Sequence, residues 1–103
     1  MDYRYSAGQD LARVALAGRI EAEDTPKLKE PFLRAESQGL TRVELDFSAV
    51  AYIGSAGIAA LMQMHKMLAA RGGSLCIVNS PANIASMFRS LKLDRLFQME
   101  RRI

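Results

Sequence analysis

Residues 43–73, which read VELDFSAVAYIGSAGIAALMQMHKMLAARGG, decide the fold. Apolar side chains at a period of two predict a β-strand over 42–47, and residues 50–53 continue or follow it. A longer pattern with helical periodicity predicts a helix over 55–71, and the glycine pair that follows is a common helix stop. The stretch is therefore a strand, a short turn containing two glycines, and a helix.

The predicted helix over 55–71 has one apolar face. Its buried stripe is expected at Ile58, Leu61, Met62, His65 and Leu68, which follow the spacing of a helix face. With Met62 in that stripe, Met64 or Met67 must approach the other side of the helix. Flexible thioether side chains fill cores first and form partner surfaces second.

On the amino-terminal side, two short strands are expected over 3–6 and 11–17, with a turn between them and Gly18 as the end of the second. A helix then begins with Thr25 or Asp24 as its N-cap and a proline at its first position. Pro31 lies inside this helix and should kink it or delay its regular part, because proline lacks the backbone N–H.

On the carboxyl-terminal side, residues 74–78 form a continuous apolar run, as expected for a central strand covered on both sides. Ser80 and Pro81 repeat the cap-plus-proline start of a helix. The buried stripe of this third helix is expected at Ile84, Met87, Phe88 and Leu91. Residues 96–99 are a candidate for a last short strand.

The order of elements is therefore β-β-α-β-α-β-α-β. Strand–helix–strand units imply parallel pairing with right-handed crossovers, and the opening hairpin adds an antiparallel edge. We predict a single α/β domain over residues 1–103. It is a mixed sheet, mostly parallel, covered by about three to four helices.

Composition narrows the functional classes. The chain has 103 residues, a formal net charge of +3 and one cysteine, Cys76. A lone cysteine forms neither an internal disulfide nor a cysteine-based metal site. No apolar run approaches the ~20 residues of a membrane span, and the first residues contain no apolar signal segment. Basic and acidic residues are interspersed along the chain, so no basic patch indicates a nucleic-acid partner. We therefore expect a cytoplasmic protein, monomeric or weakly dimeric, without metal, cofactor, nucleic-acid partner or membrane insertion.

Ser55 is the residue best placed for chemistry. It is predicted at or next to the N-cap of the long helix, where its hydroxyl would accept a hydrogen bond from the backbone. A cap alone is one interpretation. The other is that Ser55 carries a phosphate, because a helix N-terminus stabilises an anion. Gly54 and Gly57 permit backbone conformations or close approaches that a Cβ would block.

A nucleophilic enzyme is not indicated. His65 is the only histidine, and ten residues of helix place it about 15 Å from Ser55, beyond the reach of a general base. Glu21, Glu23 and Asp24 form an acidic cluster, which we interpret as an exposed loop before a helix rather than a metal site. We therefore predict no catalytic residues.

The central motif, LDFSAVAYIGSAG over residues 45–57, resembles that of the STAS domain, the fold of bacterial anti-sigma factor antagonists. In that family a strand reading L-D-[LF]-S-x-V leads to D-S-[ST]-G at the start of a long helix. The similarity extends to RGGSL over 71–75, to LKLDRLF over 91–97 and back to GRIE over 18–21. It covers nearly the whole chain.

The resemblance implies a partner-switching protein. Such an antagonist binds an anti-sigma factor, usually a serine kinase, and thereby frees a sigma factor. The kinase phosphorylates the motif serine, and a PP2C-type phosphatase restores it. By position, Ser55 is the candidate phosphoacceptor. The docking surface would be formed by Glu21, Glu23, Asp24, Gly54, Ser55, Ala56, Gly57 and Ile58.

Two positions depart from the family motif. Gly54 replaces the usual acidic residue, and Ala56 replaces the second hydroxyl residue. The run from Ser55 to Leu61 is also similar to the STAS subunits of phospholipid-transport ABC systems. Those subunits bind an ATPase subunit and need no phosphoserine. This second function stays open at the level of sequence.

Overall fold

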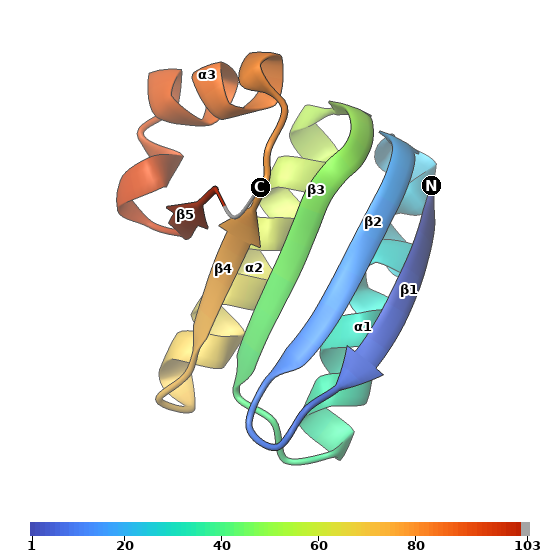
Figure 1. Ribbon diagram of the computed structural model, residues 1–103, viewed down its shortest axis with the longest axis vertical. Coiled ribbons are helices and arrows are strands. Elements are labelled where there is room, and N and C mark those ends of the chain that lie inside the picture. Colours follow the sequence, from blue (N-terminus) through green and yellow to red (C-terminus); the bar gives the residue numbers. More distant parts are fainter. Residues whose placement is uncertain (102–103) are drawn as a thin grey trace.

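A five-stranded sheet forms the centre of the computed structural model, which describes residues 1–101 (Figure 1). The last two residues, including Arg102, lie outside this range. The strands are β1 (Asp2–Ala7), β2 (Ala12–Ile20), β3 (Arg42–Ile53), β4 (Ser74–Val78) and β5 (Gln98–Glu100). They lie side by side in sequence order.

Helices connect the strands from β2 onward. The α-helices are α1 (Thr25–Ser37), α2 (Ser55–Ala70) and α3 (Ala82–Ser90), with single 3-10 turns η1 (Ala22–Asp24) and η2 (Leu93–Arg95). β1 pairs with β2 antiparallel, and β2 to β5 pair in parallel. The predicted α/β class, with a mixed sheet and an antiparallel edge, is confirmed.

The helices leave one face of the sheet open. Each parallel connection advances by one strand in the same direction, so right-handed crossovers place successive helices on the same face. Figure 1 shows α1 and α2 together behind the sheet, with no helix in front of it. The expectation that residues 74–78 form a strand covered on both sides is confirmed for β4: Leu75 to Val78 point alternately to its two faces, and all four are buried.

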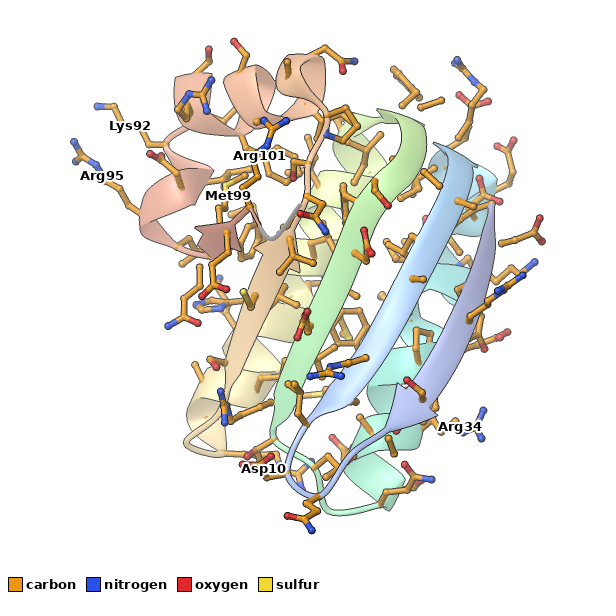
Figure 2. The ribbon with its side chains drawn as sticks, viewed as in Figure 1. Asp10, Arg34, Lys92, Arg95, Met99 and Arg101 are labelled. Atoms are coloured by element: carbon orange, nitrogen blue, oxygen red, sulfur yellow. The ribbon has the colours of Figure 1, made fainter. Side chains whose placement is uncertain are left out.

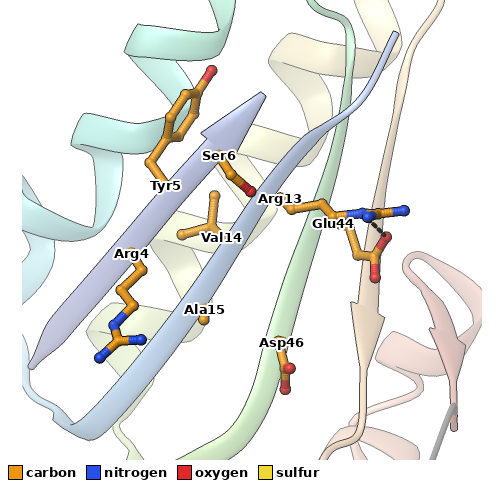
Figure 3. Close-up of a pocket in the computed structure, with 8 residues that line it drawn as sticks. All are labelled: Arg4, Tyr5, Ser6, Arg13, Val14, Ala15, Glu44 and Asp46. Atoms are coloured by element: carbon orange, nitrogen blue, oxygen red, sulfur yellow. Dashed lines mark ion pairs between the residues drawn. The ribbon is translucent and has the colours of Figure 1, made fainter. Parts of the chain in front are cut away.

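The open face is charged (Figure 3). Arg13 of β2 and Glu44 of β3 are register partners, and their Nε and Oε2 atoms lie 3.6 Å apart. Glu44 is only 7% exposed, the one charged side chain among the buried residues of the described chain. Arg4 and Asp46 border the same shallow hollow. Polar residues here replace the apolar layer that a second set of helices would require.

β2 is longer than predicted. It begins at Ala12 rather than at Leu11, and its buried side chains follow the phase of Ala12, Val14 and Leu16. Gly18 does not end the strand. It takes a left-handed φ of 90° at a register shift, and β2 continues to Ile20. Glycine adopts this conformation without steric cost, so the irregularity bends the strand instead of stopping it.

α2 is rotated relative to the predicted stripe. Its buried residues are Gly57, Ile58, Ala60, Leu61, Met64 and Leu68. Met64 is therefore buried, whereas Met62 and His65 are only partly buried. The predicted burial of Met62 is wrong because the buried face is turned toward Gly57, Ala60 and Met64, while Ile58, Leu61 and Leu68 are buried as predicted. Gly57 and Ala60 allow the helix to lie close to the strands.

α1 runs from Thr25 through Pro31 without a delayed start, and Pro31 itself is buried. Asp24 is its N-cap residue, but the Asp24 side chain makes no capping bond to the helix. In α3, Ile84 and Phe88 are buried as predicted. Leu91 lies beyond the last residue of α3 and is 54% exposed, so its predicted burial is wrong.

Neither a membrane-crossing helix nor a metal-binding cluster is found in the described part of the chain. No helix there is both long and apolar enough to cross a bilayer. No group of three or more His, Cys, Asp or Glu side chains gathers in a way that could hold a metal ion.

Candidate functional site

Ser55 is the first residue of α2, and its side chain is exposed. Gly54 is the N-cap residue, with an extended backbone, and its N–H donates to the Ile20 carbonyl at 2.9 Å. The Ser55 hydroxyl makes no hydrogen bond to any described residue. The predicted position next to the N-cap is confirmed, but the Ser55 hydroxyl does not cap the helix. It is exposed to solvent.

Gly57 holds this end of α2 against the sheet. A Cβ at Gly57 would lie 2.9 Å from Cγ1 of Ile53 and 3.0 Å from Cγ2 of Ile20. These two residues end β3 and β2 and are register partners. Real Cβ atoms essentially never show a distance of 2.9 Å, so a side chain at position 57 would require Ile53 or the helix to shift. The predicted close approach is confirmed at Gly57.

An aromatic side chain that the sequence analysis missed lies beside Gly54, the residue before Ser55. Tyr52, near the end of β3, is 41% exposed. Because β2 continues past Gly18, Arg19 stands opposite Tyr52, and its guanidinium lies 4.4 Å from the ring centroid. Arg19 also pairs with Glu21, with 3.3 Å between Nη2 and Oε1. The three side chains form one connected group, which we call the Tyr52 stack.

The Tyr52 stack reaches the turn at the start of α2. A Cβ at Gly54 would lie 3.3 Å from the Tyr52 hydroxyl oxygen. The space beside Gly54 is thus bounded by Tyr52. The available sequence signal was Tyr52, two positions before Gly54, with the cation Arg19 opposite it on β2. This pairing can be recognised only when the register of β2 against β3 is known.

The acidic cluster is an ordered turn. The Glu21 N–H donates to Oδ2 of Asp24 at 2.8 Å, and the charged N-terminus lies 3.6 Å from Oδ1 of Asp24. This hydrogen bond first, and the positive N-terminus second, lower the pKa of Asp24. η1, which contains Glu23 and Asp24, packs against α2. Glu23 is exposed.

The structure therefore brings most of the expected docking residues to one edge of the sheet. Ser55 and Glu23 are exposed; Glu21, Asp24, Gly54 and Ala56 are partly exposed. Gly57 and Ile58 are buried, so they position α2 rather than form its outer surface.

His65 does not belong to this group. It lies further along α2, and its ring packs edge-on against Phe97 with 5.6 Å between centroids. It is turned toward the carboxyl-terminal elements and supplies no base to Ser55.

Residues 4–99 match the family described as "Mlab, STAS domain". That match covers most of the chain. The chain belongs to the STAS domain family. No curated protein sequence matches it at a significant level.

Solved structures support the same fold for this STAS domain. A proposed anti-sigma factor antagonist from Thermotoga maritima is 18% identical, with a TM-score of 0.88, over 98% of this chain and 87% of its own. An anti-sigma factor antagonist from Mycobacterium paratuberculosis is 19% identical, with a TM-score of 0.83, over 96% and 84%. The phosphorylated form of SpoIIAA, a Bacillus cell fate determinant, is 15% identical, with a TM-score of 0.78, over 99% and 92%.

Proposed function

We propose that this STAS domain is an anti-sigma factor antagonist that works by partner switching. In its unmodified form it binds an anti-sigma factor that is also a serine kinase, and the sigma factor is released. Phosphorylation of Ser55 ends the binding, and a PP2C-type phosphatase reverses the modification. The protein carries out no catalysis of its own.

The single observation that carries this proposal is the exposed, unbonded hydroxyl of Ser55 at the first residue of α2. A kinase requires an accessible hydroxyl on a backbone that tolerates the added phosphate. The N-terminus of a 16-residue helix tolerates it well, because its free N–H groups and dipole favour negative charge. Membership of the STAS family and the fold shared with anti-sigma factor antagonists agree with this role.

The Tyr52 stack and the acidic turn would supply the docking surface. Tyrosine and arginine are the residues that most often dominate binding energy at interfaces, and here they are already stacked before a partner arrives. Preorganised side chains lose less conformational entropy on binding. Glu21 and Glu23 give this surface a negative character, which suits a partner with basic residues at its rim.

Phosphorylation would act through charge. It adds about −1.5 to −2 units at neutral pH, next to an acidic turn and inside a surface that binding removes from water. A loss of about 3 kcal/mol would weaken the complex roughly 100-fold, which is enough for a switch. The absence of an acid at position 54 leaves the acceptor, the exposed hydroxyl of Ser55, in place.

The test uses the full chain, its anti-sigma kinase and ATP. Intact-mass measurement should show one added phosphate on the wild-type protein and on Ser80→Ala, but none on Ser55→Ala. Ser80 is the matched control because it also follows a strand and precedes a helix, but its hydroxyl is buried. The phosphorylated protein should then bind the kinase about 100-fold more weakly than the unmodified one.

Two results would count against the proposal. One is the absence of any phosphate gain on the wild-type chain, and the other is an undiminished gain in Ser55→Ala. If the unmodified chain instead binds a transporter ATPase and no kinase, the phospholipid-transport function replaces this one.

A further inference from the structure

A small hollow of about 190 Å³ lies where β4 and β5 end, away from the Ser55 turn. It is lined by Ser80 just after β4, by Ala85 and Arg89 of α3, and by the end of β5 with the residue that follows it. In Figure 2, Arg101 lies between α3 and the end of β4, close to Met99. The carboxyl ends of parallel strands are where open α/β sheets usually bind ligands.

Three polar groups in this hollow lack a partner among residues 1–101. The Ser80 hydroxyl oxygen is buried and makes no hydrogen bond. Arg89 and Arg101 form no ion pair, whereas Arg13, Arg19, Arg42 and Arg71 each do. A buried hydroxyl without a partner is unfavourable, and such groups usually mark the place of a water or a ligand.

The backbone that places Ser80 is itself unusual. Asn79 has a left-handed φ of 59°, a conformation that is uncommon outside glycine. The Asn79 N–H donates to the Glu100 carbonyl at 2.9 Å, so the ends of β4 and β5 are tied together at this point. Non-glycine residues in this conformation cluster at ligand sites, where the surrounding structure maintains them. The turn brings the hydroxyl of Ser80 and the residues after β5 to one hollow.

We propose that this hollow binds a phosphate group, held by Arg89, Arg101 and the hydroxyl of Ser80. The planar guanidinium fork matches the oxygens of a phosphate, and the serine hydroxyl donates one further hydrogen bond. Its size suits an inorganic phosphate or a small phosphomonoester rather than a nucleotide. Glu100 also lines it, so two arginines and one carboxylate face the hollow. The site does not depend on the role of Ser55.

Because the hollow contains both cations and a carboxylate, variants that remove one or the other should change phosphate affinity in opposite directions. The full-length chain is titrated with inorganic phosphate, against chloride at matched ionic strength, while backbone amide shifts are followed by NMR. Saturable shifts should appear at Asn79, Ser80, Ala85 and Arg101. Glycerol 3-phosphate, titrated in parallel, distinguishes a site for free phosphate from a site for phosphomonoesters.

Three variants give the expected ranking. Arg89→Gln should weaken phosphate binding by about tenfold or more, because a charge-assisted hydrogen bond is lost. Glu100→Gln should tighten it, because a repelling carboxylate is removed. Arg95→Gln is the matched control: this exposed cation lies outside the hollow, and its loss should change affinity little.

Non-saturating shifts, shifts equal to those with chloride, or equal affinity in wild type and Arg89→Gln would overturn the proposal. Because Arg89 is exposed on the surface of α3, its replacement leaves the fold intact, and the amide spectrum of the variant verifies this directly.

Discussion

Two of the junctions between a strand and a helix at the carboxyl edge of the sheet, at Ser55 and at Ser80, have similar sequences and opposite structures. At the first, a glycine with ordinary backbone angles precedes an exposed serine that begins α2. At the second, an asparagine with positive φ precedes a serine whose hydroxyl is buried, and Pro81 is the N-cap of α3.

Neither serine caps its helix, although both positions match the sequence pattern of a cap. The backbone before the serine differs between the two junctions. It is extended at Gly54, where the next residue is exposed, and left-handed at Asn79, where the next hydroxyl is buried. The comparison teaches that the chemistry of a strand–helix turn depends on one φ angle that residue types alone do not fix. Four predictions test this contrast.

Gly57→Val should have the largest effect. A side chain here would overlap Ile53 and Ile20, and overpacking of this kind destabilises by about 3 kcal/mol. Ala82→Val, two residues after the second serine and exposed, is the matched control and should stay within about 0.5 kcal/mol of wild type. Urea unfolding measures both. Equal stability of the two variants would show that close approach is not specific to the first junction.

Tyr52→Ala should weaken binding to the protein partner by about 2 kcal/mol, or about 30-fold, because an interface anchor is removed. Leu91→Ala is the control, since Leu91 is at least as exposed but lies after α3. Calorimetric titration with the partner compares them. A larger loss with Leu91→Ala would move the docking surface to the second junction.

The acidic turn beside the first junction should make stability depend on pH. The pKa of Asp24 is lowered in the folded state, so the ionised carboxylate stabilises the fold above its unfolded pKa of about 3.9. That contribution is lost as the pH falls through the lowered, folded pKa. Urea unfolding between pH 7 and pH 3 should show a shallower decline for Asp24→Asn than for wild type. Parallel curves would contradict this assignment.

Ser80→Ala should have the smallest effect on stability. Because the hydroxyl is buried without a partner, replacing it with hydrogen leaves the protein unchanged or stabilises it by up to about 1 kcal/mol, in phosphate-free buffer. Ser55→Ala removes an exposed, unbonded hydroxyl and should change stability by less than about 0.5 kcal/mol. A marked loss of stability in Ser80→Ala would mean that its hydroxyl is hydrogen-bonded within the native protein.

Element order and sheet type were predictable from the sequence, because apolar periodicity is strong from Val43 to Leu68. Two details were not. Gly18 ends a strand or forms an irregularity within it, depending on whether the residues after it pair with a neighbouring strand. Here Arg19 and Ile20 pair with β3, so the strand continues. The face of α2 was misplaced because periodicity weights large side chains, whereas the buried face also includes the small residues Gly57 and Ala60.

For the candidate site, the sequence located Ser55 and the acidic turn but not the Tyr52 stack. Arg19 and Tyr52 are 33 positions apart and meet only through the register of two parallel strands. Cross-strand pairs of this kind require the three-dimensional arrangement, because no local pattern relates them. The same is true of Arg89 and Arg101 around Ser80.

The two outermost strands have a consequence for behaviour at high concentration. β5 is three residues long, and β1 alternates charged Asp2 and Arg4 with tyrosines whose hydroxyls donate to Glu30 of α1 and to Gln38, which follows α1. Short or charged borders are poor templates for recruiting another chain. The protein is thereby protected against fibrous aggregation, although it exposes both borders of its sheet.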